Sequence, residues 1–187
     1  MSRNWLRNSL GAAVIVVALV ATMGEGSPSE SSGGNSDTPT TVKSSAAAPI
    51  ALGTAVTVAK GWDVKVNSAQ LNADAELKAA NMFNTPDPGA QFVTVNVSVT
   101  NNSTKPEALF TNVKLSLLPP SGVAISSSFV AGIGGALDTS AQMQPGATAT
   151  GVLVYEVPSA QVTGSVLLGE PFMTLDTAKD QRFFALQ

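Results

Sequence analysis

The sequence contains no cysteine and no histidine. Without cysteine the chain forms no disulfide, and it lacks the lipid-modified N-terminal cysteine of bacterial lipoproteins. Without histidine it lacks the commonest general base and the commonest ligand of transition metals. Both absences argue against an enzyme, and no cofactor or metal site is expected.

Charge is also sparse, at 12% of the residues. Ten basic and thirteen acidic residues give a formal net charge of −3, and the basic residues form no stripe. Nucleic acid is therefore not an expected partner, because its phosphates require clustered Lys and Arg. A serine nucleophile would need lysine as its base. No Ser-x-x-Lys motif follows residue 50, which disfavours a hydrolase.

Residues 1–23 have the order of a secretory signal. Arg3 and Arg7 precede an uncharged apolar run from Leu10 to Met23. The run is short for a membrane-spanning helix, which needs about 20 apolar residues, and the cleavage motifs after it are poor. A signal peptide and an uncleaved signal anchor both remain open, and a buried core helix is the less favoured third interpretation. The basic start predicts that everything after the run lies outside the cytoplasm, secreted or anchored to the outer face of the cell membrane.

Residues 24–49 are rich in Ser, Gly, Thr and Pro, and Val42 is their only large aliphatic residue. Such a composition cannot bury enough apolar surface to offset the entropy of ordering. A disordered linker is predicted here, acting as a passive spacer.

Residues 50–187 are predicted to form a single all-β domain. Apolar and polar residues alternate through 54–58, 62–67, 92–100 and 113–118, and further strands are expected near 123–125, 150–158, 165–168 and 182–186. The first two runs flank Gly61, either as a hairpin or as one bent strand. Short strands separated by turn residues favour an antiparallel β-sandwich.

Two segments interrupt this pattern. Residues 69–88 form a long loop in which 73–80 favour one or two helical turns, and residues 126–142 are ambiguous. The candidate partner-binding residues lie here: Asp74, Glu76, Phe83, Asp87 and Phe129. The three acids lack a calcium-loop spacing and are interpreted as solvated charges. Most aromatic side chains are expected in the core. Phe83 and Phe129 are the two for which exposure to solvent is most expected, and burial is the alternative for both.

The segments Gly89–Ser103 and Met143–Pro158 together resemble the telokin-like family of secreted bacterial domains of unknown function. The first has a glycine, then Phe92-Val93, alternating valines and Asn101-Asn-Ser103; the second has Met143-Gln-Pro145-Gly146 and ends in Tyr155-Glu-Val157-Pro158. That family is related in fold to the mycobacterial immunoprotective extracellular antigen. The resemblance implies an immunoglobulin-like β-sandwich and no known reaction. It supplies no functional residues.

These features favour a non-enzymatic extracytoplasmic binding or adhesion module of the bacterial cell envelope. Its partner would be an envelope protein, a glycan or a peptide, with membrane contact through residues 1–23 if they are not cleaved. The alternative is a structural or accessory subunit of an envelope complex, held by the N-terminal helix.

Overall fold

The computed structural model describes residues 44–173 and 177–187, so the predicted signal segment (1–23) and most of the predicted linker lie outside the described residues. In chain order the elements are β1 (Ala55–Ala59), β2 (Trp62–Gln70), α1 (Asp74–Ala80), β3 (Ala90–Asn101), β4 (Glu107–Ala108), the 3₁₀ turn η1 (Leu109–Thr111), β5 (Val113–Leu118), β6 (Ile125–Ser126), β7 (Gln142–Met143), β8 (Thr148–Pro158), the 3₁₀ turn η2 (Ser159–Gln161), β9 (Val166–Pro171), α2 (Thr177–Asp180) and β10 (Arg182–Phe184). Within the described ranges no helix has the length and apolar character needed to cross a membrane.

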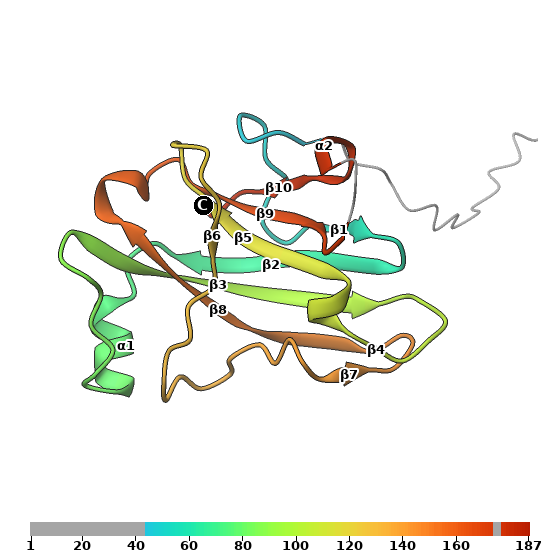
Figure 1. The fold of residues 1–187 in the computed structure, drawn as a ribbon, viewed down its shortest axis with the longest axis horizontal. Helices are drawn as coiled ribbons and strands as arrows, with labels where there is room; N and C mark the ends of the chain where they lie inside the picture. Colours follow the sequence, from blue (N-terminus) through green and yellow to red (C-terminus); the bar gives the residue numbers. More distant parts are fainter. Residues whose placement is uncertain (1–43, 174–176) are drawn as a thin grey trace, which may run out of the picture. The chain divides into compact units, whose positions relative to one another are not determined.

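Two four-stranded antiparallel sheets make up the domain (Figure 1). The first sheet has the order β1-β2-β3-β8 and the second the order β10-β9-β5-β6. Strands β4 and β7 pair with each other separately. The prediction of a mostly β, antiparallel sandwich of two sheets is confirmed.

Strand β3 shows how the sequence produces this architecture. Val93, Val95, Val97 and Val99 are all fully buried, while the polar residues between them face outward. Successive side chains of a strand point to opposite faces, so this alternation gives one apolar face and one polar face that is directed toward solvent. Burying each valine contributes about 1.5–3 kcal/mol. The strand is central because β2 and β8 pair with it on both sides.

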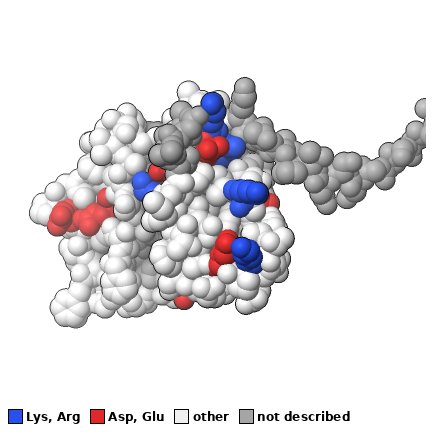
Figure 2. All heavy atoms as spheres, turned by 45° about the vertical axis from the view of Figure 1, so that its right-hand side comes forward, with Lys and Arg blue, Asp and Glu red and all other residues white. Residues whose placement is uncertain are grey.

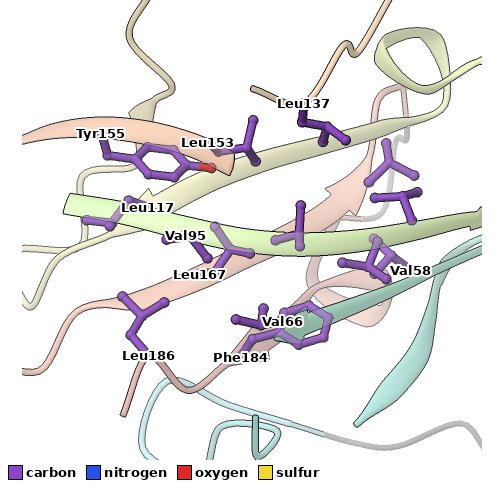
Figure 3. Packing of buried hydrophobic residues seen from close by; sticks show 14 of the residues in the cluster. Val58, Val66, Val95, Leu117, Leu137, Leu153, Tyr155, Leu167, Phe184 and Leu186 are labelled. Atoms are coloured by element: carbon purple, nitrogen blue, oxygen red, sulfur yellow. The ribbon is translucent and has the colours of Figure 1, made fainter. Parts of the chain in front are cut away.

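The core lies between the two sheets. The side chains in Figure 3 come from both of them, with Val66 and Val95 from the first sheet and Leu117, Leu167 and Phe184 from the second. Trp62, Tyr155 and Phe184 are the largest fully buried side chains. One continuous core therefore holds the sheets together.

The two runs around Gly61 form the hairpin β1–β2 rather than one bent strand. Gly61 has a φ of +78°, which only glycine adopts at little cost. A Cβ at this position would also lie 3.1 Å from the backbone of Ser103. The turn therefore needs glycine for both its conformation and its close packing.

Helix α1 occupies the segment 73–80 where helical turns were predicted. Its residue Leu77, with Ala73 before it, packs against Phe92 of β3 and Val154 of β8 in a second, smaller cluster. Because neighbouring Val93 and Tyr155 point into the main core, Phe92 and Val154 lie on the opposite face of the first sheet. The helix thus covers part of the outer face of that sheet.

The described chain already contacts the second sheet before residue 50. The Phe183 N–H donates to Ser44 Oγ at 2.9 Å, and the Ile50 N–H donates to the Phe183 C=O at 2.7 Å. Residues 44–49, which the sequence analysis assigned to the linker, therefore lie alongside β10.

Candidate functional site

Asn84 joins the two segments that the sequence left irregular. Its Nδ2 donates to the C=O of Leu77 in α1 and to the C=O of Ala131 in the segment 126–142, at 2.9 Å each. Asn84 is buried, and the backbone at Gly132 approaches Ala80 so closely that a Cβ would meet its carbonyl oxygen at 3.1 Å. The loop after α1 and the segment around Ala131 are therefore packed together.

Phe83 and Phe129 flank this junction and both point to solvent. Phe83 is 83% exposed and Phe129 97% exposed, and Met82 beside them is 73% exposed. Phe83 precedes Asn84, and Phe129 lies two residues before Ala131, so the Asn84–Ala131 bond keeps them in one region. We call Met82, Phe83 and Phe129 the aromatic surface.

The three candidate acids have different surroundings. Asp74 Oδ1 accepts the Phe92 N–H at 2.7 Å, which fastens the first turn of α1 to β3. The Asp87 N–H donates to Glu156 Oε1 at 2.6 Å, so the Asp87 backbone is fixed while its side chain is exposed. Glu76 is exposed on α1. Among the described residues, no group of three or more acidic side chains is placed to hold a metal ion.

A groove runs between β5, β6 and β8. One hollow of about 220 Å³ is lined by Phe110, Phe172 and residues of β5, and a second of about 260 Å³ is lined by Phe129 and residues of β8. The two hollows share Ser127, Thr139 and Leu153. We call them together the edge groove. It leads from Phe110 and Phe172 at one end to Phe129 of the aromatic surface at the other.

The edge groove contains little charge. Among the described residues, Lys114 is the only charged one that lines it, and the Lys114 Nζ donates a hydrogen bond to Glu170 Oε1 at 3.1 Å. Figure 2 likewise shows a largely uncharged face on which Lys and Arg form separate spots and no continuous stripe. The groove therefore suits an uncharged occupant better than an ionic one.

Two titratable groups beside the groove have shifted pKa values. The Ser140 hydroxyl at 2.7 Å, together with the Ser140 N–H, lowers the pKa of Asp138 because both donors stabilise the carboxylate. Burial raises the pKa of Tyr155 far above its usual range, because the phenolate cannot be solvated there. Neither group is a poised catalytic acid or base near neutral pH.

Sequence reasoning missed three contributors to this region. Asn84 lies in the predicted long loop 69–88 and was not singled out, yet it is the buried link between two loops. Phe110 and Phe172, expected in the core, are 50% and 48% exposed and line the groove. For Phe110 a signal existed, since it follows Leu109 directly and Leu109 takes the buried position of η1.

Comparison with protein families matches residues 51–176 to the family described as "Domain of unknown function (DUF4352)". The chain belongs to the DUF4352 family. The match spans every strand of the domain except β10. The finer kinship of this DUF4352 domain with the telokin-like family stays a prediction.

Solved structures that are similar to this chain come from bacteria. The YjhA protein of Bacillus subtilis is 16% identical with a TM-score of 0.51, over 74% of this chain and 99% of that one. An uncharacterized β-sandwich protein of Clostridium difficile is 10% identical with a TM-score of 0.46, over 80% and 99% of the two chains. A conserved hypothetical protein of Bacillus anthracis is 14% identical with a TM-score of 0.47, over 73% and 95%. No curated protein matches the chain. The likeness to YjhA supports the fold of this DUF4352 domain and carries no function.

Proposed function

We propose that this DUF4352 domain is a non-enzymatic binding module on the outside of a bacterial cell, and that it binds a protein partner through the aromatic surface. The observation that carries the proposal is the exposure of Phe83 and Phe129 on two loops that Asn84 fastens together. Aromatic side chains dominate the binding energy of many protein interfaces, and paired loops hold them with little ordering cost. Single apolar residues scattered over a surface are normal and would not indicate a binding site, whereas apolar residues gathered in one region do.

The location outside the cell is part of this proposal. It is supported by the basic start and apolar run of residues 1–23, followed by a Ser/Gly/Thr/Pro-rich stretch that can act as a tether. A binding role agrees with the lack of histidine and cysteine, because the commonest nucleophile–base pairs are then missing.

We also propose the closer kinship, an immunoglobulin-like sandwich related to the telokin-like family. Its support is the position of the two resembling segments. Gly89–Ser103 contains β3 and Met143–Pro158 contains β8. These strands pair along eleven consecutive residues, from Ala90↔Pro158 to Thr100↔Thr148. The two motifs are therefore one structural unit, made of the inner strand β3 and the edge strand β8 of the first sheet.

The test uses the full chain with a photo-crosslinking amino acid in place of Phe83. A protein partner captured from envelope preparations is purified, and its Kd for the unlabelled chain is then measured by calorimetry. We expect the double variant F83A/F129A to weaken binding about 30-fold or more, as removal of a buried aromatic hot spot does.

The matched control is M173A, which truncates a side chain that is 86% exposed and lies outside the aromatic surface. It should leave the Kd within about twofold of the wild-type value. Equal binding by wild type and F83A/F129A would show that the aromatic surface does not mediate the interaction.

A further inference from the structure

Within the described part of the chain, strand β5 has one edge that is largely without a strand partner. On its other side it pairs with β9 along its whole length, Val113 to Leu118. Strand β6 covers only Ser116 and Leu117. After Ser126 the chain turns to the first sheet, where the Ser128 N–H donates to the Val154 C=O at 2.7 Å. Val113–Leu115 therefore faces the edge groove without a neighbouring strand in the described chain.

A single hydrogen bond fixes which backbone groups face this edge. The Phe172 N–H donates to the Asn112 C=O at 2.9 Å, so the pair 112↔172 is a hydrogen-bonded one. In an antiparallel ladder hydrogen-bonded and non-hydrogen-bonded pairs alternate. The backbone N–H and C=O of Lys114 and Ser116 consequently form hydrogen bonds with β9. The N–H and C=O of Val113 and Leu115 point the other way, toward the groove.

One of these four groups is already used. Tyr155 Oη donates to the Leu115 C=O at 3.3 Å. The N–H of Leu115 and both groups of Val113 have no bond among the described residues. An open strand edge of this kind is a template for another strand.

We propose that the edge groove binds an extended, uncharged peptide segment of a partner protein, which adds as a strand beside β5. Main-chain bonds to Val113 and Leu115 would supply affinity, and alternate side chains would enter the hollow between Phe110, Leu153 and Phe172. The one charged side chain among the described lining residues, Lys114, is paired with Glu170, which selects against charged side chains at the inward positions of the peptide.

A second copy of the chain is the poorer occupant. An antiparallel β5–β5 pair using only Val113 and Leu115 would be centred on Lys114 and would place the two lysines opposite each other. Like charges directly opposite on neighbouring strands destabilise the pairing. The hollow beside β5 is lined by neither Phe83 nor Phe129, and the proposal does not require the aromatic surface to bind anything.

The test follows amide hydrogen exchange of the full chain by NMR. Without ligand, the Val113 and Leu115 amides should exchange at least about tenfold faster than those of Lys114 and Ser116, which bond β9. The probe is the capped peptide acetyl-Ser-Thr-Val-Thr-Val-Thr-Ser-amide. Its addition should shift the Val113 and Leu115 signals and slow their exchange about tenfold or more.

Two peptide analogues distinguish strand addition from general stickiness. One is N-methylated at both valines and the other at the second and third threonines, so each blocks the N–H groups on one edge of the peptide. Strand addition predicts that one analogue loses binding and the other keeps it, because only one edge faces β5. The variant F110A should weaken binding of the unmodified peptide, and V123A, exposed outside the groove, should not.

Three outcomes would overturn the inference. The Val113 and Leu115 amides could already be protected in the free chain, which would mean that another part of the chain occupies the edge. Both analogues could bind equally, or the peptide could shift signals only elsewhere. Because these readouts concern β5, such failures leave the test of Phe83 and Phe129 unaffected.

Discussion

Tyr155 is the only tyrosine of the chain and is fully buried in the sandwich core. Its ring packs among apolar side chains from both sheets, and its hydroxyl reaches the edge of the second sheet at Leu115. Burial raises the pKa of this phenol above its ordinary value of about 10. A single side chain therefore links core packing to the strand edge that borders the groove.

This shift predicts how stability depends on alkaline pH. The folded pKa lies above the unfolded one, so the contribution is fully present below about pH 10 and is lost as pH rises further. Above pH 10 the unfolded chain releases the proton that the folded chain keeps, and Tyr155 lowers the free energy of unfolding by about 1.4 kcal/mol per pH unit. Absorbance at 295 nm should show tyrosinate only when circular dichroism shows unfolding. Tyrosinate formed near pH 10 with a native spectrum would contradict the buried position.

Burial of individual residues was predictable where neighbours repeat with a fixed period. The four valines of β3 are buried as the alternation requires. Phe110 and Phe172 have no such repeat, and their half-exposed positions depend on how η1 and the end of β9 meet across the groove. Aromatic side chains are buried in cores on average. That average does not predict whether a particular aromatic side chain at the rim of a sheet is buried or exposed.

At the scale of elements, the segment 126–142 depends on one glycine in β8. The Leu137 N–H donates to the Val152 C=O at 3.0 Å, and the Val152 N–H donates to the Gly135 C=O at 2.8 Å, so the segment covers part of the β8 edge. A Cβ on Gly151 would lie 2.6 Å from both Cα and N of Leu137. The backbone can approach β8 this closely only because residue 151 has no side chain.

We therefore expect Gly151→Ala to lower the free energy of unfolding by about 1–3 kcal/mol, as overpacking does. The matched control is Gly134→Ala in the same segment, where an added Cβ meets no atom within 4 Å and the effect should stay within about 0.5 kcal/mol. Urea denaturation of both variants measures the difference. Equal midpoints for the two variants would show that the contact between Gly151 and Leu137 is not tight in solution.

The contrast between α1 and this segment shows what the sequence can predict about elements. Residues 73–80 combine good helix formers, so local propensity was enough. Residues 126–142 have no periodic pattern. Bonds to β8 and to Asn84 hold the segment in place, and its local bonds include those that Ser140 and Ala141 donate to Asp138. The candidate site was predictable as two irregular segments carrying Phe83 and Phe129, but their junction depends on tertiary contacts.

At the scale of the whole molecule, the sequence before the sandwich predicts where the domain works. Arg3 and Arg7 ahead of an apolar run favour export with the N-terminus inside, whether or not the segment is later removed. The sandwich has no disulfide to form. It can therefore fold after export without an oxidising step.

The full chain expressed in a bacterium should consequently be found outside the cytoplasm, in one of two forms. Intact mass of protein from the medium that lacks about the first 22–26 residues would identify a signal peptide and a diffusible domain. Full-length mass in the membrane fraction, with the sandwich digested by protease added to intact cells, would identify a signal anchor. As a control, an enzyme known to reside in the cytoplasm of the same strain must stay intact in that digestion. Full-length protein in the cytosol, resistant to external protease, would refute export and with it the proposed binding role at the cell surface.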